Sequence, residues 1–246
     1  MKQKFSISIQ LIILIFSVLF CIILASLFSR MTLSNLGFND LSLSNPKAYL
    51  VSGFFSQVVG FVGGFILFLK ITKQSLKSVI NFKQPTFKFI SIVFGLLIIA
   101  FPLMMYIGYL NSFLKDIIPN NNFILQEIET DKYQLALLTT KGNLMLSIKL
   151  IVIAILPAIG EELIFRGVIL TKIKQASGNI HYAVIVSAVV FAGIHLQPTK
   201  LLPMIFLGIV LGYLYSKTKN IFYPMLFHFL FNGTTILLTH YGFVNL

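Results

Sequence analysis

The chain has 246 residues, of which 57% are apolar and 11% are charged, and it contains no tryptophan. Soluble domains usually carry about 25% charged residues, so this composition excludes a soluble globular protein. A net charge of +12 would suit nucleic-acid binding in a soluble chain. Here the lysines fall between apolar runs and act as topology signals, so we expect a lipid bilayer as partner and no nucleic acid.

Apolar stretches follow one another along the chain, as expected for helices of about 20 residues that cross a ~30 Å hydrocarbon core. We predict about seven spans, at residues 8–29, 48–71, 88–111, 144–171, 180–197, 200–216 and 221–240. The first apolar run is longer than the core of a cleavable signal peptide and should remain as a helix. Residues 123–138 are less apolar and are expected to form an interfacial helix or an extra short element. The fold class is therefore an all-α, polytopic transmembrane bundle.

Basic and acidic residues separate between alternate connections. If every span crosses, one side receives Lys2, Lys4, Lys70, Lys73, Lys77, Lys83, Lys88, Lys172, Lys174, Lys217 and Lys219. The acids outside the buried pair then fall on the other side, at Asp40, Asp116, Glu127, Glu129 and Asp131. This separation predicts a cytoplasmic N-terminus and an external C-terminus. We expect a single membrane domain over residues 1–246, with N-terminal spans in 1–111 and motif-bearing helices in 144–240.

Three charged residues, Glu161, Glu162 and Arg166, lie inside the fourth predicted span. One charge near the bilayer centre costs roughly 3 kcal/mol on insertion scales, so a group of three indicates function. Glu162 and Arg166 are i,i+4 neighbours and are predicted to form an ion pair. Glu161 lies about 100° around the helix and is left to face water or substrate. Pro157 and Gly160 should disturb the helix just before these acids.

Two later spans carry polar groups at matching depth. A rise of about 1.5 Å per residue places Glu162, His195, His228 and Asn232 roughly 14–21 Å from the cytoplasmic ends of their spans. In a core ~30 Å thick, all four lie near the middle. His228 and Asn232 also share one helix face. The pattern predicts one polar site assembled from three helices.

Other residues are expected to have structural roles. Small residues indicate close helix packing at Gly60, Gly63, Gly64, Gly208 and Gly212. Lys149, near the outer end of its span, is expected to snorkel toward water. His181 and His240 lie near span ends and are expected to bond a neighbouring helix or lie at the interface.

The motifs E-E-x-x-x-R, F-x-x-x-H and H-x-x-x-N on successive apolar helices resemble the CAAX prenyl protease and bacteriocin-processing family of intramembrane proteases. The resemblance covers about residues 144–240. It implies that Glu161, with His195, activates water, and that Glu162 and Arg166 form a supporting pair. It also implies that His228 and Asn232 position or stabilise the carbonyl oxygen.

The resemblance leaves the metal open, because the family includes a zinc protease and a metal-free glutamic protease. We favour metal-free catalysis without a cofactor, since the chain has no H-E-x-x-H motif. In the zinc alternative, Glu161, His195 and His228 would be the ligands and water would take the open position. The expected substrate is a membrane-associated peptide or protein, which in some relatives is lipidated.

Two other function classes compete with an intramembrane endopeptidase. A transporter could use Glu161 and Glu162 as a proton or cation site. However, the first three spans have no ionised residue near their middle, whereas transporters often have related halves. A bacteriocin-immunity or scaffold protein would bind without cleaving. We predict a protease of a bacterial inner (cell) membrane.

Overall fold

The computed structural model describes residues 5–38, 45–117 and 121–244. Every regular element in these ranges is a helix, and no strand occurs among them, which confirms the all-α class. The α-helices are α1 (Ile7–Asn35), α2 (Pro46–Phe55), α3 (Gly64–Thr72), α4 (Leu76–Val79), α5 (Phe87–Ser112), α6 (Leu114–Ile117), α7 (Asn122–Thr139), α8 (Asn143–Lys149), α9 (Leu156–Glu162), α10 (Thr171–Ser177), α11 (Ile180–Gly193), α12 (Leu201–Thr218) and α13 (Phe222–Tyr241). Shorter π-helical or 3₁₀ stretches join some of them: η1 (Ser56–Gly63), η2 (Leu150–Ile155), η3 (Leu163–Leu170) and η4 (Pro198–Lys200).

Helices are found in all seven predicted ranges. Their length and apolar character are those of an integral membrane protein. Within the described residues, five helices are long and apolar enough to cross a membrane: Ile7–Asn35, Ala48–Thr72, Phe87–Ile117, Asn143–Ser177 and Pro198–Thr218. Helix α11 is apolar but has only 14 residues, or about 21 Å of rise. It ends at Gly193 because the chain turns there, with Leu196 in a left-handed conformation (φ 53°). The count of seven crossings therefore stays a prediction.

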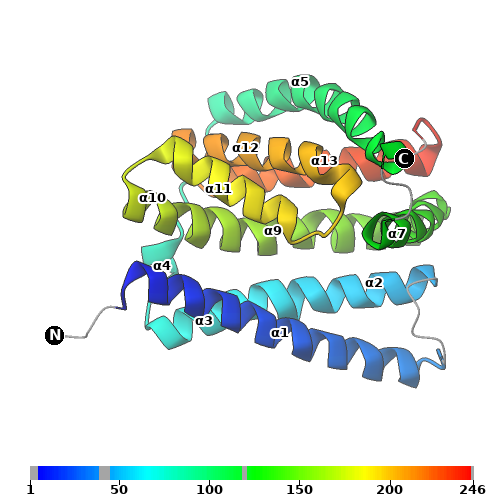
Figure 1. Ribbon diagram of the computed structural model, residues 1–246, viewed down its shortest axis with the longest axis horizontal. Helices are drawn as coiled ribbons and strands as arrows, with labels where there is room; N and C mark the ends of the chain where they lie inside the picture. Colours follow the sequence, from blue (N-terminus) through cyan, green and yellow to red (C-terminus); the bar gives the residue numbers. More distant parts are fainter. Residues whose placement is uncertain (1–4, 39–44, 118–120, 245–246) are drawn as a thin grey trace.

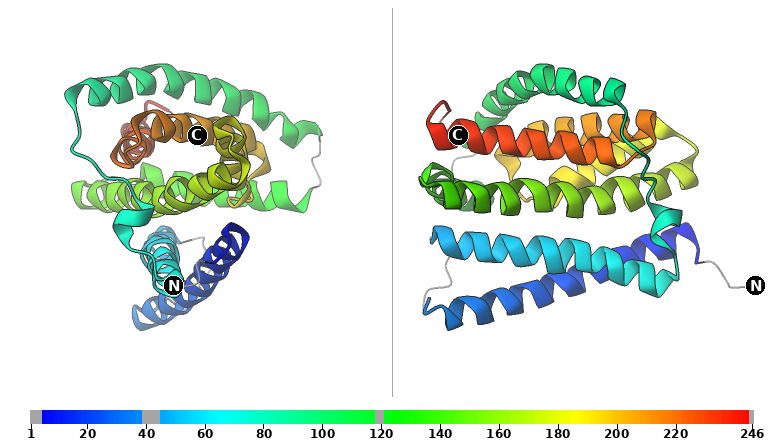
Figure 2. Two further views of the ribbon diagram at one scale, coloured as in Figure 1. Left: turned by 90° about the vertical axis from the view of Figure 1, so that its left-hand side faces the viewer. Right: turned by 180° about the vertical axis from the view of Figure 1, so that it is seen from behind.

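The helices form layers that place the acid-bearing helix in the interior. The pair made by α1 and the continuous α2–η1–α3 helix lies on one side, and α5 lies on the opposite side (Figures 1 and 2). Helices α8 to α13 fill the space between them, with α5 packed on α12 and α13, and α9 packed on η1. Helix α7 lies across one end of the bundle, against α2, α13 and η4. Its presence confirms the helix expected at 123–138.

Successive long helices run in opposite directions, which separates the connections into two ends (Figure 1). The start of α1 lies at the same end as the connections 73–86, 178–179 and 219–221, and the described lysines predicted to share a side lie in these connections or in the helices that adjoin them. Helix α7, η4 and the end of α13 lie at the other end. Lys2, Lys4 and Asp40 lie outside the described residues. The direction of this arrangement in a cell stays a prediction.

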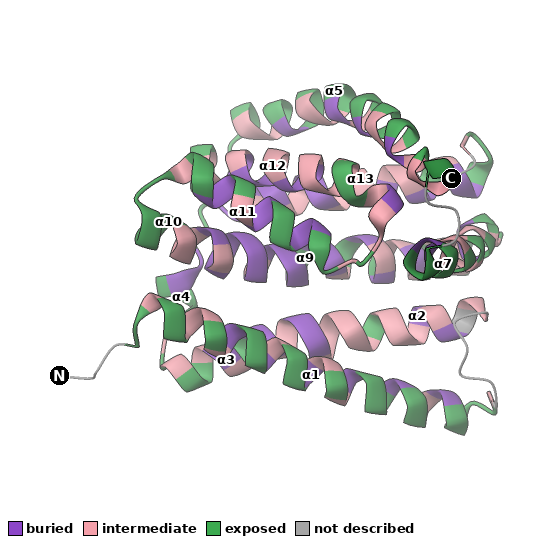
Figure 3. Cartoon of the chain, viewed as in Figure 1, coloured by how far each residue is buried: buried purple, intermediate pink, exposed green. Residues whose placement is uncertain are grey.

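Many large apolar residues are exposed on the outside of the bundle, and Figure 3 shows how exposed positions run along its outer helices. Exposed residues concentrate along α1 and α5, where Phe16 is 69% exposed and Ile98 is 74% exposed. A water-soluble protein would bury such side chains, so these faces are suited to lipid. The main core cluster joins residues from α1, such as Leu14, to residues from α13, such as Phe227.

Glycines allow the closest helix contacts, as predicted. A Cβ atom added at Gly208 would lie 2.7 Å from Cβ of Ala188, so α12 meets α11 almost at backbone distance. A Cβ at Gly64 would lie 2.8 Å from Cα of Val18 on α1. The contact at Gly63 is looser, with no atom nearer than 3.6 Å. Because glycine has no side chain, the helix backbones can approach each other closely at these points, which strengthens packing in a membrane.

Candidate functional site

The two acids and the arginine of the first motif are buried at the junction of α9 and η3. Glu161 is 6% exposed, Glu162 is fully buried and Arg166 is 1% exposed. Nη1 of Arg166 lies 2.7 Å from Oε1 of Glu162, so the predicted i,i+4 ion pair is present. Nη2 of Arg166 also donates to the carbonyl oxygen of Gly208, and the guanidinium lies 4.9 Å from the centre of the Phe191 ring. Both terminal nitrogens of the arginine therefore have partners, whereas its Nε is buried without one among the described residues; the ion pair offsets much of the cost of burying the charge.

The helix that carries the acids is π-helical on both sides of α9, in η2 and η3. Such segments are rare and often occur at functional sites. Pro157 has no N–H, so the carbonyl oxygen of Ile153 lacks its α-helical partner. Nδ2 of Asn232 donates to this oxygen from α13 at 3.1 Å. The disturbance expected from Pro157 therefore ties the third motif to the first.

His228 contacts both acids. Its Nδ1 lies 3.0 Å from Oε1 of Glu162, and its Nε2 lies 3.9 Å from Oε2 of Glu161. The carboxylate of Glu162 is paired with Arg166 and can only accept, so Nδ1 of His228 carries a proton. The other ring nitrogen is therefore directed toward Glu161.

His195 lies beside this cluster, in the turn that follows the end of α11 at Gly193. Its Nδ1 is 2.8 Å from the carbonyl oxygen of Phe191. A carbonyl can only accept, so the proton is on Nδ1 and the neutral ring keeps a free lone pair on Nε2. Within the described residues, the structure shows no hydrogen bond between His195 and Glu161. The ring of Phe191 lies between the motifs, 5.1 Å from that of His195 and 6.1 Å from that of His228.

The structure adds a polar residue that sequence reasoning missed. Nε2 of Gln57, in η1 of the second predicted span, donates to Oε1 of Glu161 at 3.0 Å. An uncharged amide in the middle of an apolar span was the available signal, because such groups also need a partner in a membrane. Its partner could not be identified from the sequence, since 104 residues separate the two.

A second missed group holds the loop that follows His195. Glu127 of α7 is 3% exposed, and its carboxylate accepts from the backbone N–H of Thr199 at 3.0 Å and from the Thr199 hydroxyl at 2.6 Å. The next residue, Lys200, pairs with Asp131 of the same helix. From α5, Nδ2 of Asn111 donates to the carbonyl oxygen of Pro198. From the sequence, Glu127, Glu129 and Asp131 could be assigned only to one side of the membrane, and it was not predicted that Glu127 is buried and holds this loop.

Lys149 corrects another expectation. It is fully buried and does not snorkel, because its Nζ donates to the carbonyl oxygens of Leu138 and Thr140 and contacts Nδ1 of His240. These carbonyls lie at the end of α7, where the last carbonyl oxygens of a helix have no N–H donor within the helix. A lysine side chain can donate to them instead. His240 is thus bonded between helices as expected, and so is His181, whose Nδ1 lies 2.6 Å from the Tyr213 hydroxyl.

No group of three His, Cys, Asp or Glu side chains is arranged to hold a metal ion within the described ranges, residues 5–38, 45–117 and 121–244. Glu161, His195 and His228 therefore do not stand as a zinc site in this geometry. Because side chains can move when a metal binds, the choice between metal-free and zinc catalysis stays a prediction.

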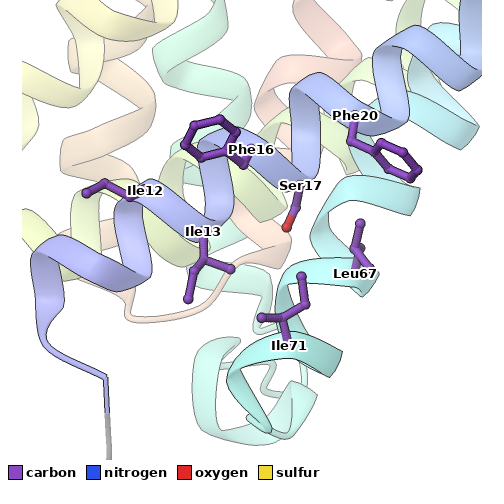
Figure 4. A pocket seen from close by; sticks show the side chains of 7 residues that line it. All are labelled: Ile12, Ile13, Phe16, Ser17, Phe20, Leu67 and Ile71. Carbon is purple, nitrogen blue, oxygen red and sulfur yellow. The ribbon is translucent and has the colours of Figure 1, made fainter.

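A pocket of about 270 Å³ lies between α1 and α3 (Figure 4), and neither Glu161 nor Glu162 lines it. Apart from Ser17 its lining is apolar, with no titratable group: Ile12, Ile13, Phe16, Ser17, Phe20, Leu67 and Ile71. Hydrolytic chemistry requires acids, bases or polar donors, so this pocket is not a candidate active site.

The fold and the site together define an integral membrane protein with a charged site buried among its helices. Residues 143–234 match the family model described as type II CAAX prenyl endopeptidase Rce1-like, which confirms the resemblance carried by the three motifs. A segment of 89 residues is 30% identical to the protein named "Putative membrane peptidase YdiL" of Bacillus subtilis (strain 168). That match covers 36% of this chain and 36% of the relative. No solved structure matches the chain.

Proposed function

We propose that this protein is an intramembrane endopeptidase, similar to CAAX proteases, that hydrolyses peptide bonds of membrane-associated peptides or proteins. The observation that carries the proposal is that two adjacent buried carboxylates have different bonding partners. Glu162 is neutralised by Arg166 and bonded by His228, whereas Glu161 has one oxygen bonded by Gln57 and the other directed toward His228. Two glutamates with a purely structural role would not require such different partners.

In the proposed reaction, Glu161 is the general base. A water molecule donates one hydrogen bond to Glu161 and one to the free Nε2 of His195. As its oxygen attacks the carbonyl carbon of the substrate, one proton passes to Glu161 and the other hydrogen stays on the attacking oxygen. Glu161 then returns the proton to the leaving amine as the carbon–nitrogen bond breaks. This cycle consumes one water molecule and leaves the enzyme unchanged.

His228 and Asn232 are the proposed oxyanion donors. For His228 to act in this way, both of its ring nitrogens must carry a hydrogen, since Nδ1 already faces the carboxylate of Glu162. Its Nε2–H could then donate to the carbonyl oxygen. One N–H of the Asn232 amide is bonded to Ile153, and the second remains for substrate. One such donor contributes roughly 3–4 kcal/mol to the transition state.

The proposed setting is a bacterial inner membrane, with the N-terminus in the cytoplasm. No metal is required by the proposed steps. The substrate is a membrane-associated peptide or protein, with or without a lipid, whose cleaved bond reaches the middle of the bundle. The match to the family model and the name of the Bacillus subtilis relative support a peptidase.

The test is cleavage of a membrane-anchored peptide library by the purified protein in detergent. We expect Glu161→Gln and His195→Ala to abolish cleavage while the protein stays folded. His181→Ala is the matched control, since that histidine bonds Tyr213 away from the acids. Cleavage that survives a strong chelator supports the metal-free mechanism, and loss with the chelator assigns zinc to the same residues. Normal turnover by Glu161→Gln would overturn the proposal.

A further inference from the structure

We propose that Gln57 is a positioning residue that holds the carboxylate of Glu161 in its reactive orientation. This inference rests on the proposed function and extends it to a residue outside the region 143–234 that matches the peptidase family. The site would then be incomplete without the N-terminal pair of helices. Within the described residues, Gln57 is the hydrogen-bond donor that the structure shows for Glu161.

The contact depends on an unusually close approach of two helices. A Cβ atom added at Gly160 would lie 3.0 Å from Oε1 of Gln57 and 3.0 Å from Cβ of Phe61. Glycine at this position therefore lets α9 lie directly against η1. Since Gly160 precedes Glu161, the absence of a side chain there places the acid within reach of the amide. The π-helical form of η1 occurs at this point of contact.

The chemistry of the amide fixes its orientation. A carboxylate accepts hydrogen bonds, so the NH₂ group must face Glu161 and the amide oxygen must point away. In the part of the chain that the structure describes, this Oε1 is buried and receives no hydrogen bond. A buried acceptor without a partner is unfavourable, and turning the amide over would set its oxygen against the carboxylate instead. The bond to Glu161 is thus what keeps the amide in this orientation.

The bond assigns different tasks to the two oxygens of Glu161. Oε1 is held by Gln57, and Oε2, which is directed toward His228, remains to take the proton of water. Without the amide the carboxylate can rotate, and the geometry for proton transfer is lost. Gln57 itself does not need to touch the substrate, so substrate affinity should not depend on it.

Kinetics of Gln57→Met, which keeps the length of the side chain but has no N–H, test the inference. We expect kcat to fall about 10- to 100-fold with KM unchanged. Gln134→Met is the matched control: Nε2 of Gln134 also bonds another helix, at the Tyr49 hydroxyl 2.7 Å away, but it lies on α7 and does not contact the acids. This control should keep the wild-type kcat. An equal fall of kcat in both variants would assign Gln57 a packing role only.

An exchange of the two side chains tests the contact through stability. Gln57→Glu should lower Tm, because it sets two carboxylates against each other in a buried site. Adding Glu161→Gln to that variant should restore Tm without restoring cleavage, since the base is then on the wrong helix. Additive changes in Tm would overturn the contact. If the wild-type protein cleaves the peptide and Gln57→Met has the same kcat, the inference about Gln57 is overturned but the proposed function stands. If the wild-type protein cleaves nothing, the proposed function is overturned as well.

Discussion

Nδ1 of His228 lies 3.0 Å from Oε1 of Glu162, the same oxygen that accepts from Arg166 at 2.7 Å. The last of the three motifs is therefore oriented by the first, although 66 residues separate them. The shared oxygen takes part in two charge-assisted bonds, which are stronger than neutral ones: one with Arg166 on its own helix, and one with His228 that joins α13 to the acid-bearing helix. Changes at Glu162 should consequently affect both the fold and the direction in which His228 points.

Removing one member of the Glu162–Arg166 pair should be strongly destabilising. Arg166→Met leaves the buried carboxylate without its counter-charge, and Glu162→Leu does the same to the guanidinium. Breaking a buried pair in this way costs about 3–5 kcal/mol. Thermal unfolding in detergent should show a lower Tm for each single variant and a partial recovery for the double variant, with cleavage lost in all three. An unchanged Tm in both single variants would refute the structural role of the pair.

Gly160→Ala should reduce activity by separating α9 from η1. The added Cβ would come within 3.0 Å of both Gln57 and Phe61, so the helices must shift by a few tenths of an ångström. A shift of this kind displaces Glu161, and misplaced catalytic groups can cost about 100-fold in rate. Gly95→Ala in α5 is the control, because no atom lies within 4 Å of its added Cβ. It should keep wild-type kcat and gain helix stability of about 1 kcal/mol. Equal kcat in the two variants would contradict the close contact.

The Glu162–Arg166 pair could be predicted from sequence because its partners are four residues apart on one helix. The same holds for the shared face of His228 and Asn232. Helix periodicity also places His195 near the same depth. These are local relationships, since helix geometry fixes them before any tertiary structure is known.

Gln57, Glu127 and Lys149 show where prediction from sequence fails. Each has a partner on another helix, and its role depends on packing that no local pattern specifies. Lys149 has the position of a snorkelling lysine, but the carbonyl oxygens at the end of α7 lie close enough to accept hydrogen bonds from its ammonium group. The extent of α11 was also set by tertiary structure, because the loop after it is held by α5 and α7.

Gly208→Ala should destabilise the contact between α11 and α12. Its Cβ would lie 2.7 Å from Cβ and 2.8 Å from Cα of Ala188, which neither helix can relieve by a side-chain rotation. Overpacking of this kind typically costs about 1–3 kcal/mol. Because the carbonyl oxygen of Gly208 accepts from Arg166, the shift should also weaken the acid site. Adding Ala188→Gly removes one of the two clashes, so Tm should recover in part. A double variant no more stable than Gly208→Ala would locate the strain elsewhere.

Glu127→Ala should loosen the loop that follows His195. It leaves the backbone N–H and the hydroxyl of Thr199 without their acceptor, and each unpaired buried group costs about 1–3 kcal/mol. Leu196 in this loop is 70% exposed, so loosening should appear as faster cleavage of the loop by an added protease. Peptidase activity should fall too, because His195 would no longer be held at the end of α11.

The control for Glu127 is Glu129→Ala on the same helix. Glu129 is exposed and accepts from the hydroxyl of Tyr133 on the same helix. Removing its side chain should change the free energy of unfolding by less than about 0.5 kcal/mol and leave the loop protected from protease. If Glu127→Ala and Glu129→Ala were attacked by protease at the same rate, α7 would have no part in holding His195. Faster attack on Glu127→Ala alone, with reduced peptidase activity, would extend the functional unit from the three motif helices to α7.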